Sequence, residues 1–202
     1  MNLLTLKEEK ADSDQQEQSS IQKGVIIVKR IIIYGSCYGS TRKYAEKLSE
    51  LTGIDCISFD KIKDIEKYEQ IVYFGGLYAG GVVGLSKTFK KISYDTDTVI
   101  ITVGIADNKS STNIENIRNS IKKQISEGQF ENTKIFNLRG ILDYGTMGIK
   151  HKIMMFGLYQ SIKKKPYDEL DEESKSIIVT YNKRVDFINF DDLEKIVEYL
   201  NV

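Results

Sequence analysis

A six-residue loop between a β-branched run and a helical pattern carries the residue types that bind phosphate. The run Ile31–Tyr34 ends at Gly35, and the loop follows as Ser36-Cys37-Tyr38-Gly39-Ser40-Thr41. Its hydroxyls can donate hydrogen bonds to phosphate oxygens, its glycine lets the backbone approach closely, and a helix N-terminus favours an anion. It has neither the Gly-Lys-Ser/Thr ending of a nucleoside-triphosphate loop nor the Gly-x-Gly-x-x-Gly of a dinucleotide fold. The alternative is an ordinary strand-to-helix turn with a Ser or Thr cap.

The elements that would position this loop alternate between strand and helix. Apolar, β-branched runs predict five strands, at residues 31–34, 55–59, 71–74, 99–103 and 134–138. Helical patterns lie at residues 43–52 and 85–92, around Ile114, Ile117, Ile121 and Ile125, and from Asp191 and Asp192 onward, where Leu193, Ile196, Val197 and Leu200 turn inward. The alternation predicts an α/β fold with a doubly wound, five-stranded parallel sheet. Ligands of such sheets bind at the carboxyl ends of the strands.

The spacing Ser36-x-x-Gly39-x-Thr41 after the first strand resembles the phosphate loop of the flavodoxin family. The resemblance implies the strand order 2-1-3-4-5. It also implies that residues 36–41, including Cys37, Tyr38 and Ser40, wrap the terminal phosphate of flavin mononucleotide (FMN).

Two further loops are implied to bind the flavin ring. In the Gly-rich segment 75–81, Leu77, Tyr78, Ala79 and Gly80 would lie beside the ring, with Tyr78 stacking on it. The alternative is a flexible loop with Tyr78 packed on the surface. After the fourth strand, Gly104, Ile105, Ala106 and Asp107 would face the pyrimidine side, without the aromatic residue that many flavodoxins have there.

About fifty residues separate the fifth strand from the last helix, more than a parallel crossover needs, and predict an insert at residues 140–190. A second resemblance rests on Arg139, Gly140, Asp143, Tyr144, His151, Met154 and Met155. They resemble the menaquinone-dependent protoporphyrinogen dehydrogenases of bacteria, a branch of the flavodoxin superfamily. The resemblance implies an oxidoreductase with a quinone or porphyrin-type partner molecule. Within the insert, residues 168–173 predict a helix start, and residues 177–181 are either a short extra strand or a segment packed on the body.

Residues 141–165 form a basic segment with five lysines, one acid and the only histidine, a local net charge of about +4 in a chain of zero formal charge. The apolar residues of its helical pattern fall on two lines, Ile149-Ile153-Phe156 and Met155-Leu158-Ile162. Such a helix can contact an anionic membrane or a partner protein, or it can cover the sheet. The sequence therefore predicts partner or peripheral membrane contact here, with cofactor retention left to the other loops and His151 at the surface or at a helix end.

Composition indicates one globular domain at residues 24–202 after a polar tail at residues 1–23. Zero formal charge gives no footprint for nucleic acid. Two cysteines suit a reducing cytosol, and neither a secretory signal nor an apolar run of membrane-spanning length is present, so we expect a cytoplasmic protein, with any membrane contact peripheral at the inner face. No residue spacing indicates a metal site, a nucleophile or an acid–base pair, so neither metal ligands nor catalytic residues are predicted.

Two classes of function fit these features. The first is an FMN-binding redox protein, either an electron carrier or an oxidoreductase, which needs no catalytic side chain because the flavin supplies the chemistry. The second is a flavodoxin-fold interaction or regulatory module that binds no flavin, favoured by bulky Cys37 and Tyr38 in the loop.

Overall fold

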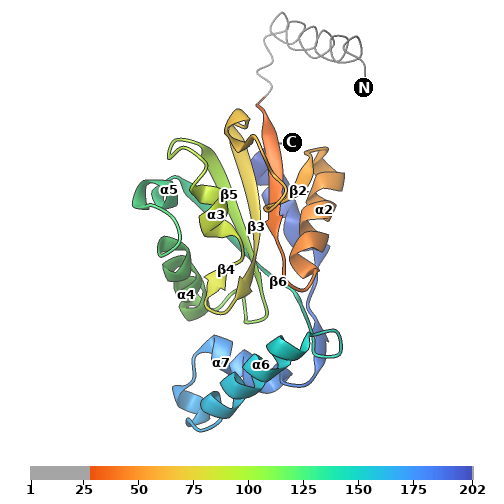
Figure 1. Cartoon of the computed structure of the whole chain (residues 1–202), viewed down its shortest axis with the longest axis vertical. Coiled ribbons are helices and arrows are strands. Elements are labelled where there is room, and N and C mark those ends of the chain that lie inside the picture. Colours follow the sequence, from red (N-terminus) through yellow and green to blue (C-terminus); the bar gives the residue numbers. More distant parts are fainter. Residues whose placement is uncertain (1–27, 202) are drawn as a thin grey trace, which may run out of the picture.

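The central sheet has the predicted strand order. The computed structural model describes residues 28–201, so the predicted tail at residues 1–23 lies outside the described residues. The parallel strands are β1 (Arg30–Gly35), β2 (Cys56–Ser58), β3 (Gln70–Tyr78), β5 (Asp97–Gly104) and β6 (Thr133–Arg139). They run in the order β2-β1-β3-β5-β6, which is the predicted order 2-1-3-4-5. The doubly wound parallel sheet is thus confirmed, and Figure 1 shows its strands between layers of helices.

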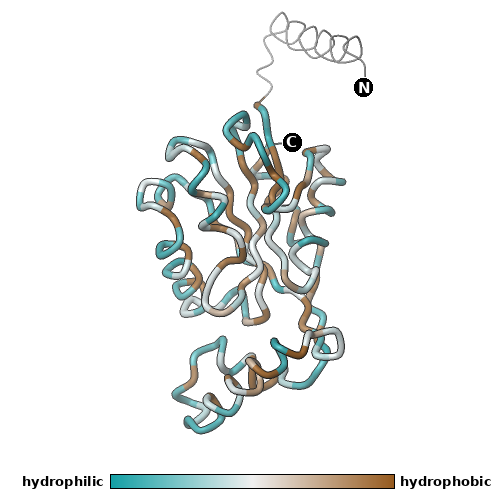
Figure 2. The backbone as a smooth tube through the Cα atoms, in the orientation of Figure 1, coloured by the Kyte–Doolittle hydropathy of each residue, from teal (hydrophilic) through white to brown (hydrophobic). Residues whose placement is uncertain are grey.

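Each face of the sheet has its own core, because side chains alternate along a strand. Ile31 and Ile33 pack on one face and Ile32 on the other. The first core includes residues of α3 (Leu85–Phe89), α4 (Ser111–Lys122) and α5 (Glu127–Glu131). The second includes residues of α2 (Ser40–Thr52) and α8 (Glu194–Leu200), together with Leu193 at the end of the 3-10 turn Phe190–Leu193. Figure 2 shows hydrophobic residues along the central strands, as burial on both faces requires.

Strand β3 extends further than predicted. The Gly-rich residues expected to form a loop at 75–81 instead continue β3 to Tyr78 and then form the short antiparallel strand β4 (Gly81–Val82). Glycine is needed here because a Cβ atom at Gly75 would lie 2.0 Å from Val82 Cγ1. Only Ala79 and Gly80 remain as a two-residue turn, both with positive φ (50° and 74°), as in a tight hairpin.

The insert is a separate layer at the carboxyl ends of the parallel strands, seen below the sheet in Figure 1. It contains β7 (Ile141–Asp143), α6 (Ile149–Ile162), the 3-10 turn Tyr167–Glu169, α7 (Glu172–Thr180) and β8 (Arg184–Asp186). β7 and β8 pair antiparallel, so both ends of the insert are tied together where it leaves the body. One alternative expected this helix to cover a face of the sheet. Instead, α6 lies at the end of the sheet.

Two expectations concern the second half of the insert. Residues 177–180 belong to helix α7, so of the two alternatives for residues 177–181 the extra strand is excluded, and a segment packed on its neighbours is what the structure has. The acidic run does start a helix, because the Asp171 side chain caps α7 by accepting a hydrogen bond from the Ser174 N–H at 2.8 Å. Packing against α6 and α4 outweighs the strand preference of Ile177 and its β-branched neighbours.

Candidate functional site

The loop after β1 is a cradle for an anion at the start of α2. Helix α2 begins at Ser40, and the Lys43 N–H donates to the Gly39 carbonyl at 3.0 Å, closing its first turn. The N–H groups of Ser40 and Thr41 therefore precede the first closed turn. Among the described residues no side chain caps α2, so the capped-turn alternative is wrong. The cradle presents helix N–H groups and hydroxyls without a basic side chain.

Glycines set the shape of the cradle at two points. Gly39 has φ +90°, a backbone conformation that L-residues rarely adopt, and its N–H donates to Ser36 Oγ at 3.0 Å. A Cβ atom at Gly140 would lie 2.7 Å from Ser40 Oγ, so the end of β6 packs directly on the cradle. Thr41 is only 2% exposed and lies against Gly76 of β3. The cradle is thereby fixed from two neighbouring strands.

The β3–β4 turn is held by helix α4. Ser120 Oγ donates to the Gly80 carbonyl at 2.7 Å, and the Val82 N–H donates to Gln124 Oε1 at 3.3 Å. Because these bonds fix both sides of the turn, Ala79 and Gly80 are held in place beside the cavity.

The loop after β5 is held by Arg139. Its Nε and Nη2 donate to the Ile105 carbonyl at 3.1 and 2.8 Å, and its guanidinium lies 3.7 Å from the centroid of the Phe187 ring. Asp107 is an exposed turn residue whose carboxylate accepts from the Lys109 N–H, and its carbonyl accepts from Asn113 Nδ2 at 2.7 Å. Arg139 therefore positions the loop and does not line the cavity.

Two further residues of the predicted dehydrogenase-like stretch, Asp143 and Tyr144, hold the insert. Asp143 Oδ1 accepts from the Gly145 N–H at 2.8 Å, and its Oδ2 lies 3.6 Å from Arg184 Nε on β8. Tyr144 packs with Leu142 and Met147 in a small core of the insert. Their contacts are structural, at the base of the insert.

These loops meet at one cavity of about 510 Å³, within the size range of small-molecule sites. Of the predicted site residues it is lined by Cys37, Tyr38, Ser40, Thr41, Leu77, Tyr78, Ala79, Gly80, Gly104, Ile105 and Ala106. Ser36, Gly39 and Asp107 shape the loops but do not line it. The structure thus brings the three predicted loops together at the carboxyl ends of the strands.

Sequence reasoning missed two walls of the cavity. Helix α4 contributes Asn113, Asn116, Ile117 and Ser120, and the insert contributes residues of α6 and α7. The α4 residues were detectable in principle, because their spacing of three and four places them on one face of a helix. Met154, Met155, Leu158 and Ile162 of segment 141–165 line the same cavity as the cradle. The expected division of roles, with cofactor retention left to the other loops, stays a prediction.

An aromatic cluster of Tyr38, Tyr78 and His151 joins the insert to the cradle. The ring centroids lie 5.2 to 6.2 Å apart in edge-to-face arrangements, and the Tyr78 hydroxyl donates to Met154 Sδ at 3.6 Å. Burial, with a smaller effect of Tyr78, raises the pKa of Tyr38 to about 12, so its phenol is neutral at neutral pH. His151 lies in the first turn of α6, so its expected place at a helix end is confirmed, and there it contacts Tyr38 and Tyr78.

Residues 28–201 contain no group of three or more His, Cys, Asp or Glu side chains placed to hold a metal ion. No helix in this part of the chain combines the length and hydropathy needed to cross a membrane.

The chain matches a known protein family. The family model described as flavodoxin domain matches residues 31–169, from β1 to the turn before α7. No curated protein matches.

Several solved structures resemble the chain. A protein described as a flavoprotein, from Bacteroides uniformis, has a TM-score of 0.41 and 13% identity, over 56% of this chain and 91% of that one. A flavoprotein in complex with FMN from Lactobacillus acidophilus has a TM-score of 0.38 and 12% identity, over 56% of this chain and 93% of that one. A flavodoxin variant from Fusobacterium nucleatum bound to FMN has a TM-score of 0.34 and 17% identity, over 59% of this chain and 80% of that one.

Proposed function

This chain belongs to the flavodoxin-domain family, and we propose that it binds FMN non-covalently in the cavity and carries electrons through it. The observation that carries this proposal is the convergence of an uncharged anion cradle and two fixed loops on one cavity at the carboxyl ends of parallel strands. Bound FMN would supply the redox chemistry, so the proposal requires no catalytic side chain.

The residues present fit such a cofactor. Ser40 and Thr41 offer hydroxyls and free helix N–H groups to a phosphate, and the helix dipole adds a partial positive charge. Leu77, Ile105 and Ala106 give apolar surface for a flat ring. Leu77 lies on β3 beside the turn that α4 holds, and Ile105 and Ala106 lie on the loop that Arg139 holds. A rigid site of this kind orients a ring at little entropic cost.

Within this proposal the insert favours an oxidoreductase for a small molecule over a carrier that docks proteins. Helices α6 and α7 wall the cavity on the side that the sheet leaves open, which restricts access for a protein partner. The likeness of residues 139–155 to protoporphyrinogen dehydrogenases supports the same class and suggests a quinone or porphyrin-type substrate.

The outward side of α6 supports peripheral contact with an anionic membrane. Ile149, Ile153 and Phe156 are 78%, 67% and 52% exposed, and none of them lines the cavity. They share the helix with Lys150 and Lys152. Exposed apolar residues beside lysines match an anionic lipid surface in both hydropathy and charge.

Purification and cofactor titration test the proposal directly. We expect flavin absorbance in the purified protein, and FMN binding when the cofactor-free protein is titrated. A folded, cofactor-free protein that binds no FMN would refute the proposal and favour an interaction module.

A further inference from the structure

Helix α7 gives the cavity a wall that the cradle and the two flavin loops do not supply. Glu173, Ser174, Ser176, Ile177 and Thr180 line this wall, and Met155, Leu158 and Ile162 of α6 adjoin it. The flavodoxin-domain match ends at residue 169, so α7 lies outside the part of the chain that the family defines. We call the space between α6 and α7 the insert compartment.

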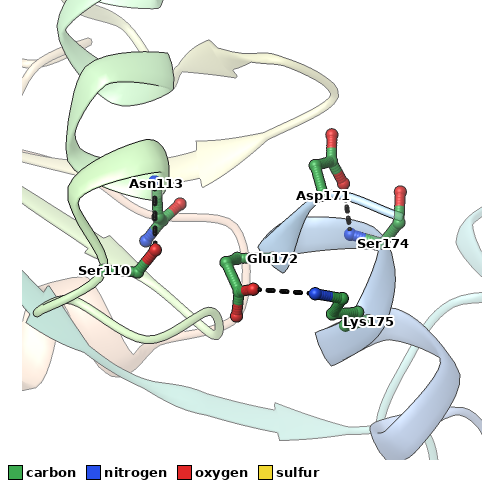
Figure 3. A network of polar contacts seen from close by, with 6 residues as sticks. All are labelled: Ser110, Asn113, Asp171, Glu172, Ser174 and Lys175. Atoms are coloured by element: carbon green, nitrogen blue, oxygen red, sulfur yellow. Dashed lines mark hydrogen bonds and ion pairs between the residues drawn. The ribbon is translucent and has the colours of Figure 1, made fainter. Parts of the chain in front are cut away.

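Glu173 is the charged group of the cavity. Among the described residues, the lining includes no lysine or arginine, and Glu173 is its one acid. The neighbouring acids are engaged elsewhere, as Figure 3 shows: Asp171 caps α7, and Glu172 pairs with Lys175 at 3.1 Å. No ion pair of Glu173 is present within residues 28–201. Glu173 is exposed, and it is the one charged side chain of a largely apolar lining within the described residues.

Burial raises the pKa of the Glu173 carboxyl, and Asp171 raises it further. Both effects favour the neutral form of this carboxyl over its charged form. A second carboxylate brought beside Glu173 would lose water and gain repulsion, with no cation in the lining to offset either.

We propose that the insert compartment binds a second ligand beside the cofactor, a neutral and largely apolar small molecule, and that Glu173 excludes carboxylates from it. The proposal rests on the proposed cofactor site and narrows its substrate class. A substrate that carries carboxylates would have to keep them outside the compartment.

Two isosteric probes test the charge preference on the FMN-loaded full chain. Naphthalene-2-carboxamide is neutral and naphthalene-2-carboxylate is an anion at pH 7.5, and calorimetry or equilibrium dialysis gives both affinities. We expect the amide to bind about fivefold tighter, since like charges at close range repel even where water screens them. Glu173→Gln should remove most of this difference. Glu172→Gln is the matched control and should keep it, because Glu172 pairs with Lys175 and does not line the cavity.

Each other outcome overturns the proposal in a recognisable way. Equal affinities in the unmodified protein, or an unchanged difference in Glu173→Gln, would show that Glu173 does not select the ligand. If the amide binds only the FMN-free chain, the α6 and α7 residues contact the cofactor itself and no second compartment exists. The proposal that the chain binds FMN is unaffected by this result. If neither probe binds either form, or if Ile177→Trp leaves amide binding unchanged, the compartment assignment is wrong. Failure of FMN to bind is a separate result, read from the cofactor titration alone.

Discussion

Replacing Gly39 by alanine should weaken FMN binding, and replacing Gly53 by alanine should not. The two glycines lie at opposite ends of α2, with φ +90° and +72°, and at neither would a Cβ atom meet another atom within 4 Å. The pair therefore isolates backbone strain from steric clash. Forcing an L-residue into this region costs about 1–2 kcal/mol.

Both variants should therefore lose roughly that much free energy of unfolding, less about 0.4–1 kcal/mol from the reduced entropy of the unfolded chain. Only Gly39→Ala distorts the cradle. If its loop relaxes to relieve the strain, FMN must restore the strained form, and about 1–2 kcal/mol corresponds to a loss of roughly 5- to 30-fold in affinity.

Urea unfolding measures the stability term, and titration of the cofactor-free protein with FMN measures the binding term. Gly53→Ala should bind FMN within about twofold of the unmodified protein, given the usual additivity of distant sites. Equal FMN affinity in all three proteins would refute the phosphate assignment. Equal losses in both variants would show that binding follows global stability and not the cradle.

Four further predictions test other parts of the protein. Thr41→Ala should weaken FMN binding by about 1 kcal/mol through loss of a hydroxyl donor. FMN should outcompete FAD in titrations because the cradle closes around a terminal phosphate, and tighter FAD binding would contradict this. Glu173→Gln should be more stable than the unmodified protein at neutral pH and equally stable below pH 4.5. The reason is that the folded-state pKa of Glu173 is raised above its ordinary 4.5, so the unmodified protein loses stability as the pH rises from 4.5 through the folded-state pKa. Urea unfolding midpoints of both proteins at pH 4 and 7.5 measure this difference. Replacing the five lysines of residues 141–165 by glutamine should reduce co-sedimentation with anionic vesicles at low salt, and the absence of salt-sensitive binding by the unmodified protein would rule out membrane contact.

The sheet and the loops were predictable because their signals are local. A strand buried on both faces needs a nearly continuous apolar run, as at Ile31–Ile33, and such runs stand out from the helical patterns between them. Parallel strands place their following loops at one edge, so the cradle and the segments after Tyr78 and Val103 had to meet there.

The exceptions are places where tertiary contacts decide. Gly75 and Gly76 look like loop residues, yet they continue β3, because β1 and β5 pair with Gly75 on either side and β5 also pairs with Gly76. Ile177 lies in a β-branched run, yet it is helical, because Asp171 caps the helix and α6 and α4 pack on it. In both places the local preference is weak compared with pairing and packing across the chain.

The position of α6 was hidden for a different reason. Its apolar residues lie on two sides: Met154, Leu158 and Ile162 line the cavity, while Ile149, Ile153 and Phe156 face outward. A helix with one apolar side indicates its packing direction, but a helix with two does not. The same two-sided pattern agrees with our proposal of a small-molecule site beside a membrane-contacting surface. One side of α6 lines the cavity, and the other leaves exposed apolar residues beside Lys150 and Lys152.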